Sequence, residues 1–312
     1  MTTAPPSAAA RHLAPPALEE IADQVHAYLQ PPGGWCLNNA GLVAGATGAV
    51  LVDTAATEHR SRALRAAVRR HAPDGPDHVV NTHFHGDHTF GNALFLPRAT
   101  IVAHERTRAD AEAAGLALCG LWPDVAWGTV DVALPTLTFH DGLTLRTGGP
   151  TVELLALAPA HTAGDVVAWV PERRVLFAGD LVWSGVTPYV LMGSVDGSLR
   201  ALDELRALRP RVVVPGHGAP GGPELFDETE AYLRWLKDLA RRGLADGRPA
   251  REVARTTDPG PFARLLDSER LVGNLHRAYA ELEGLPPGAP LDVMASFREM
   301  VDLHGGLPAC HA

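Results

Sequence analysis

The stretch "VVNTHFHGDHTFGN", residues 79–92, decides the fold class that this sequence predicts. Three histidines and an aspartate, His83, His85, Asp87 and His88, fall within six residues directly after a short apolar run. Histidine and aspartate are ligands that suit zinc or a similar metal ion. A loop that follows a strand holds such groups on a rigid sheet and exposes them at its edge. The spacing lets the first two histidines face one metal ion while Asp87 and His88 face another, so it predicts two adjacent sites.

Three further candidate ligands appear later in the chain. His161 lies in the turn "APAHTAGD", Asp180 follows the apolar run in "VLFAGDLV", and His217 follows another in "VVVPGHGAP". Each lies beside a glycine, which lets the backbone turn tightly. Taken singly, each could be a hairpin turn, a strand cap or a loop histidine. Their recurrence after apolar runs predicts that they complete the metal site.

Short strands alternate with helices up to about residue 222, and a helical tail follows Pro223. This order favours an α/β sandwich with a C-terminal helical addition. We expect a disordered or loosely packed leader over residues 1–32, a core over 33–222, and a helical region over 223–312 that packs on the core. Residues 115–130 show no period and are predicted to form a loop.

Composition narrows the class of partner. The net charge of −9 disfavours nonspecific binding to nucleic acid or to an anionic membrane. No apolar run reaches the roughly 18 residues that would span a bilayer, and residues 1–16 lack the apolar core of a signal peptide. The three scattered cysteines favour a reducing cytoplasm over a disulfide framework. We therefore expect a cytoplasmic protein with a small-molecule or thioester substrate.

Five motifs together resemble the metallo-β-lactamase fold superfamily: "LVDT" (51–54), "THFHGDH" (82–88), "HTAGD" (161–165), "FAGDLV" (177–182) and "PGHG" (215–218). The resemblance covers about residues 36–220 and implies a four-layer αββα sandwich with a dinuclear site at one edge. It also implies two divalent metal ions, with zinc the first choice. His83, His85 and His161 would bind the first ion, Asp87, His88 and His217 the second, and Asp180 would bridge both. Asp53 would position the loop of residues 83–88 without binding metal.

Two features narrow the resemblance. Metallo-β-lactamases usually have cysteine or another residue at the position of Asp180, so the ligand set looks more like glyoxalase II-like hydrolases and lactonases. The tail "NLHRAYAELEG" (274–284) and the end "MVDLHGGLPACHA" (300–312) are similar to actinobacterial proteins that include aromatic polyketide cyclases. That likeness implies a carrier-protein-linked polyketide as substrate, with ring closure and thioester hydrolysis as the reaction.

Two metal ions can activate water for attack on a thioester, or polarise a ketone for an aldol cyclisation. Asp87 and Asp180 are the candidate catalytic residues that would orient the water or accept its proton. The ligand set is compatible with both hydrolysis and cyclisation, and the substrate pocket determines which reaction occurs. A glyoxalase II-like thioesterase, a lactonase and a non-catalytic metal-binding protein remain open at this point.

The expected pocket is aromatic. Trp122, Trp127, Trp183 and Tyr189 are predicted to line it and to suit a flat polyketide, although each could equally pack in the core. The basic stretch "RSRALRAAVRR" (60–70) could dock an acidic acyl carrier protein or could simply be a solvated helix face.

Overall fold

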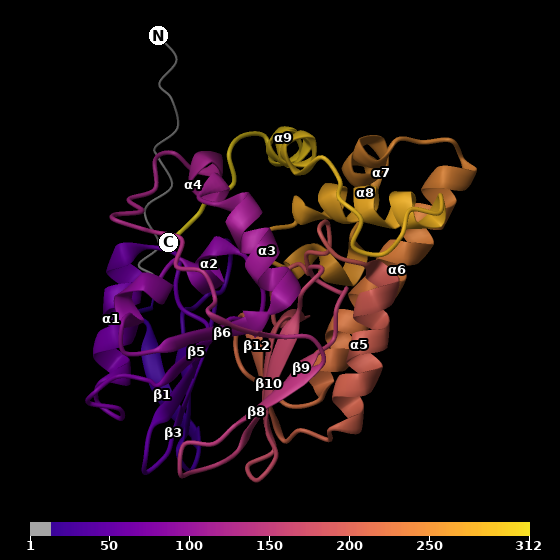
Figure 1. Cartoon of the computed structure of the whole chain (residues 1–312). Coiled ribbons are helices and arrows are strands. Elements are labelled where there is room, and N and C mark those ends of the chain that lie inside the picture. The colour runs from indigo at the N-terminus through magenta and orange to yellow at the C-terminus, as the bar shows by residue number, and fades with distance from the viewer. Residues whose placement is uncertain (1–13) are drawn as a thin grey trace.

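Runs of valine, leucine and alanine form two β-sheets in the computed structural model, which describes residues 14–312. Figure 1 shows the sheets in the middle of the molecule, with helices on their outer faces. The first sheet has seven strands in sequence order, and its first four are antiparallel. These strands are β1 (Ala17–Ala22), β2 (Val25–Leu29), β3 (Ala40–Ala44), β4 (Ala49–Val52), β5 (His78–Val80), β6 (Thr100–His104) and β7 (Leu137–Phe139).

The second sheet has five strands in the order β12-β11-β10-β9-β8. Its members are β8 (Gly142–Leu145), β9 (Val152–Ala156), β10 (Val166–Val170), β11 (Val175–Trp183) and β12 (Val212–His217). The last two run parallel, whereas the remaining pairs are antiparallel. The two sheets pack through one apolar cluster that joins Val43, Val50 and Val52 to Val166 and Val170.

Helices cover both outer faces of the sandwich. On the first sheet, α1 (Glu58–Val68) buries Leu64 and Val68 against the strands. On the second, α5 (Val195–Ala207) and α6 (Glu224–Ala245) pack against β11. The remaining helices are α2 (Gly86–Thr89), α3 (Glu105–Ala114), α4 (Ala117–Leu121), α7 (Ala250–Thr256), α8 (Arg270–Leu282) and α9 (Val293–His304), with 3₁₀ turns at Asn92–Phe95 and Gly260–Arg264. The predicted α/β sandwich with C-terminal helices is therefore confirmed.

Two local predictions are wrong. Residues 17–29 lie in the predicted leader but form β1 and β2, because Val25, Ala27 and Tyr28 are buried against the rest of the first sheet. Residues 1–13 of that leader lie outside the described residues. The predicted loop over residues 115–130 contains the short helix α4.

The topology brings the candidate ligands to one edge. Asp53 directly follows β4, the stretch 83–88 follows β5, and these two strands are parallel. His217 ends β12, whose parallel neighbour β11 carries Asp180. Parallel strands that end at the same edge place the loops after them side by side. Within residues 14–312, no helix is long and apolar enough to cross a membrane.

Candidate metal centre and substrate cavity

The structure brings together all seven predicted ligands in two adjoining groups. In the first group, one ligand atom each from His83, His85, His161 and Asp180 lies within 4.8 Å of the others. In the second group, Asp87, His88 and His217 meet the same limit. Six of these side chains are buried and His85 is half-buried. The predicted membership of each group is therefore matched by the geometry, whereas metal binding itself stays a prediction.

Asp180 has the position expected of a bridging ligand. Its Oδ2 lies 3.4 Å from His161 Nε2 and 3.8 Å from His83 Nε2 in the first group. The same oxygen lies 3.6 Å from His217 Nε2, and Oδ1 lies 3.3 Å from His88 Nε2, both in the second group. A Cβ atom on Gly216 would overlap Asp180 Oδ1, so only glycine fits beside this carboxylate.

The histidine rings are held from behind by protein acceptors. His88 Nδ1 lies 2.8 Å from Asp53 Oδ2, His161 Nδ1 lies 2.5 Å from the Tyr189 carbonyl oxygen, and His217 Nδ1 lies 2.9 Å from the Gly33 carbonyl oxygen. Each contact leaves Nε2 of that ring facing the cluster. Hydrogen bonds of this kind fix the tautomer and orientation of a metal-binding histidine.

Asp53 contacts the ligand loop, and it does not belong to either ligand group. The backbone N–H of Thr82 donates to its Oδ1 at 2.8 Å, and the Thr82 hydroxyl donates to Oδ2 at 2.7 Å. The same Oδ2 faces His88 Nδ1. One carboxylate thus fixes the start of the loop and one of its ligands.

Burial sets the protonation states of the cluster. Burial, followed by the positive charge of His88, holds the pKa of His83 well below its usual range. Burial and then His161 lower the pKa of His85 to about 3. Burial opposes ionisation of Asp180, but the charges of His217 and His88 outweigh it and lower the pKa of that carboxyl. These shifts favour a neutral imidazole at His83 and His85 and an ionised carboxylate at Asp180, which are the forms that bind metal. His88 differs, because burial opposes its charge but the carboxylates of Asp180 and Asp53 outweigh burial and raise its pKa.

The residues present fit divalent metal ions. His85 Nδ1 lies 3.0 Å from His83 Nε2 and 2.9 Å from His161 Nε2, so three ring nitrogens converge on one point. His88 Nε2 and Asp180 Oδ1 are buried, and within residues 14–312 neither makes a hydrogen bond. Buried polar atoms without partners are costly, and a cation between these atoms would satisfy them. Nitrogen and carboxylate ligands of this kind suit zinc and its neighbours.

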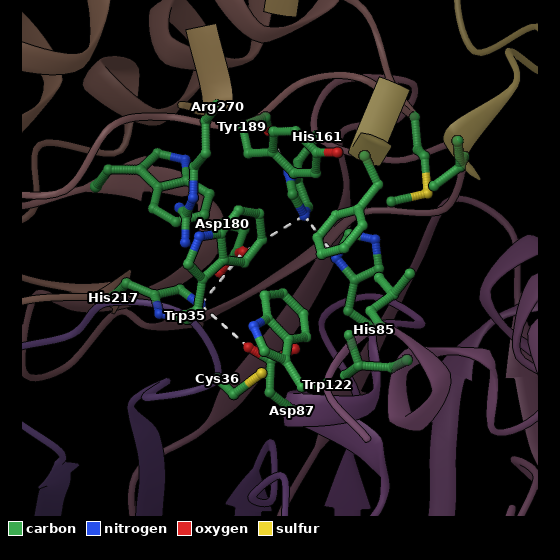
Figure 2. A pocket seen from close by; sticks show the side chains of 16 residues that line it. Trp35, Cys36, His85, Asp87, Trp122, His161, Asp180, Tyr189, His217 and Arg270 are labelled. Atoms are coloured by element: carbon green, nitrogen blue, oxygen red, sulfur yellow. Dashed lines mark hydrogen bonds and ion pairs between the residues drawn. The ribbon is translucent and has the colours of Figure 1, made fainter. Parts of the chain in front are cut away.

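The centre opens into a cavity that is largely apolar (Figure 2). Three of the four predicted pocket residues, Trp122, Trp183 and Tyr189, line it. The Trp183 ring stacks on His217 with an interplanar angle of 11°, so one wall residue also braces a ligand. Figure 2 shows Trp35 and Trp122 beside the cluster. Other lining residues outside the ligand set are Cys36, Leu118, Leu121, Met192, Arg270, Val293 and Phe297.

The prediction that Trp127 lines the pocket is wrong. Its indole N–H donates to the Trp122 carbonyl oxygen at 3.0 Å, and its ring packs against Phe90. Trp127 therefore lies behind the wall and supports Trp122. Residues 115–130 show no hydrophobic periodicity, so the sequence could not indicate toward which side each tryptophan points.

Sequence reasoning missed Trp35 and Arg270. The Arg270 guanidinium is buried 3.9 Å from the Trp35 ring centroid and 4.9 Å from that of Trp183. It donates to the Thr187 carbonyl oxygen at 3.0 Å and to Asp267 Oδ2 at 2.8 Å. Among the described residues that line the cavity, it is the one lysine or arginine, and Asp267 balances its charge. An arginine inside the helical tail carries no motif that could have placed it there.

Comparison with known proteins agrees with this geometry. The family model described as "Metallo-beta-lactamase superfamily" matches residues 33–217. A linear primary-alkylsulfatase from a Pseudomonas strain is 26% identical over 229 residues, which cover 61% of this chain and 43% of that protein. A hydroxyacylglutathione hydrolase from Methylococcus capsulatus is 34% identical over 132 residues, 42% of this chain and 43% of the other. The chain thus spans less than half the length of either relative.

A solved structure shares the fold. The metallo-β-lactamase from Pontibacter korlensis superposes with a TM-score of 0.57 at 23% identity, covering 70% of this chain and 99% of that one.

Proposed function

This chain belongs to the metallo-β-lactamase superfamily, and from this premise we propose that it is a hydrolase that acts on an apolar acyl thioester with two divalent metal ions. The substrate that we propose is a carrier-protein-linked aromatic polyketide, which is hydrolysed or cyclised. We propose zinc as the metal. One observation carries the proposal: both ligand groups face a cavity of aromatic and aliphatic side chains whose one arginine is already paired.

The residues have separate roles in this proposal. His83, His85 and His161 would hold one ion, Asp87, His88 and His217 would hold the other, and Asp180 would serve both. When bound, the two ions supply Lewis acidity toward a carbonyl oxygen and make water nucleophilic near neutral pH. Asp87 and Asp180 orient the attacking water through their carboxylate oxygens. The closed aromatic wall excludes bulk water, and its shape selects between hydrolysis and ring closure.

The cavity favours an uncharged acyl group over a glutathione thioester. Glutathione is a charged tripeptide, which needs cationic and hydrogen-bonding partners. The cavity offers one guanidinium, and Asp267 already neutralises it. Of the two relatives, one is named for linear primary alkyl sulfates and the other for hydroxyacylglutathione. The apolar walls of this cavity fit an alkyl chain, as in the name of the first relative, better than the glutathione tripeptide in the name of the second. The basic face of α1 remains our proposed docking site for an acidic carrier protein.

A substrate panel under one metal condition tests the proposal. It compares an aryl thioester that mimics a polyketide with lactoylglutathione, an acyl-homoserine lactone and a β-lactam. We expect kcat/KM for the aryl thioester to exceed the others by roughly tenfold or more, since several buried groups contribute to the difference. A clear preference for lactoylglutathione would overturn the apolar substrate class.

A pair of variants links that preference to the wall. Trp122→Leu should raise KM for the aryl thioester and leave metal content unchanged, because Trp122 lines the cavity and belongs to neither ligand group. Trp235→Leu is the matched control, since Trp235 packs against Phe262 away from the cavity. Equal effects of the two substitutions would argue against an aromatic substrate wall.

A further inference from the structure

A second cavity adjoins the metal centre and points away from it. We name it the lateral groove and define it by Phe84, Phe90, Ala113, Ala117, Leu291 and Met294. Its volume of about 420 Å³ falls in the range of small-molecule sites. The site cavity and the lateral groove share five lining residues: His85, Leu118, Leu121, Met192 and Val293. The lateral groove is therefore continuous with the centre through a predicted metal ligand.

Small and flexible side chains form its walls. Ala113 lies in the last turn of α3 and Ala117 begins α4 on one side. On the other side, Leu291 precedes α9 and Met294 lies in its first turn. Met294, which lines the lateral groove, is 49% exposed. Methionine adapts its shape to varied apolar partners, and exposed apolar side chains gathered at a cavity mark a binding surface.

The lateral groove offers almost no charge to a ligand. Its charged lining residues are Arg106 and Asp110, which pair with each other at 2.9 Å across one helical turn. Near the centre the wall changes to aromatic rings, whereas the lateral groove has only Phe84 and Phe90 among its rings besides His85. An uncharged, flexible chain fits these walls better than a flat ring system does.

We propose that the lateral groove binds the aliphatic tail of the substrate, so that a long acyl chain extends from the reacting carbonyl past His85 and between α3, α4 and α9. This inference rests on the proposed function and deepens it by naming a linear acyl chain as part of the substrate. Each methylene that the lateral groove buries contributes to binding, so the chain sets specificity.

A chain-length series tests the proposal. Turnover of acyl thioesters from butyryl to decanoyl should rise in kcat/KM by up to roughly fourfold per methylene, the factor that burial of one such group supplies. Ala113→Trp and Ala117→Trp, which fill the lateral groove, should bring the decanoyl-to-butyryl ratio close to one. Ala231→Trp on α6 is the matched control, because Ala231 is exposed and lines neither cavity. A flat profile in the wild type, or a steep one in both groove variants, would overturn the inference.

A binding measurement separates this inference from the proposed function. Dansylated undecanoate should bind the wild type and the Ala231→Trp control with enhanced fluorescence, and Ala113→Trp should weaken that binding at least tenfold. This readout needs no catalysis, so it tests whether the lateral groove binds an aliphatic chain even if no thioester is turned over. Equal affinity in the wild type and Ala113→Trp would show that the probe binds elsewhere. It would contradict the proposal that the lateral groove binds the aliphatic tail.

Discussion

At the scale of single residues, the centre depends on side chains that face the cluster and on others that hold them. The ligand candidates could be predicted because they fall beside apolar runs in the chain order of five motifs. Asp53 could be predicted as their support, and its contacts to Thr82 and His88 agree with that role. Trp35 and Arg270 could not, since their place in the wall depends on how distant elements pack.

Asp180 should be needed for both metal ions. Asp180→Ala removes a carboxylate that lies between the two groups, so metal content should fall at both sites. His217→Ala removes a nitrogen of the second group only and should leave about one metal ion per chain. Elemental analysis of purified protein measures both. Full double occupancy in Asp180→Ala would contradict the bridging role.

Asp53→Asn should weaken metal binding while all seven ligands stay in place. The amide cannot act as a charged acceptor for both Thr82 and His88, so the ring and its loop lose their orientation. Losses of about 10–100-fold in metal affinity or activity are typical for such partners. Competition with a chromophoric chelator measures the affinity, and wild-type values would refute the role of Asp53.

At the scale of elements, the strands position the candidate metal ligands, and the C-terminal helices contribute side chains to the wall of the cavity. Most strands could be predicted from their apolar runs, but β1 and β2 could not, because their segment begins in an Ala/Pro-rich stretch and is stabilised by the rest of the sheet. Similarly, α8 lies in the predicted helical tail, but nothing in its sequence indicates that its first residue, Arg270, reaches the cavity. Packing between distant elements decides such positions.

Arg270 should hold α8 against the cavity wall. Arg270→Ala leaves Asp267 without its partner and removes the group between Trp35 and Trp183. Breaking a buried ion pair from one side costs about 3–5 kcal/mol, so the free energy of unfolding should fall by that amount in urea denaturation. The double variant Arg270→Met, Asp267→Asn should recover much of the loss. A single variant as stable as wild type would show that the pair contributes little.

At the scale of the whole molecule, two stacked sheets bring loops from distant parts of the chain to one edge. The opposite face of the first sheet, which the helices cover, buries a polar group that responds to pH. On the first sheet, His26 is buried, and its ring centroid lies 4.0 Å from that of His71. Burial, and then the charge of His71, lowers the pKa of His26.

Stability should therefore fall in mild acid. Below about pH 6.5, the ordinary histidine pKa, the unfolded chain binds a proton at His26 that the folded chain resists. The contribution of His26 is complete above that pH and is lost as the pH falls toward the lowered folded-state pKa. His26→Phe should flatten this part of the profile, whereas His59→Phe at an exposed position should not. Thermal melts from pH 5 to pH 8 measure it, and unchanged pH dependence in His26→Phe would contradict the assignment.

A metal titration of the metal-free protein tests the central claim most directly. Zinc is added in steps, and bound metal and hydrolysis of an apolar aryl thioester are measured on the same samples. The two ligand groups predict no turnover without metal and a rise that reaches its plateau at two ions per chain. Full turnover by the metal-free protein, or a plateau at one ion per chain, would contradict a dinuclear metal-dependent hydrolase.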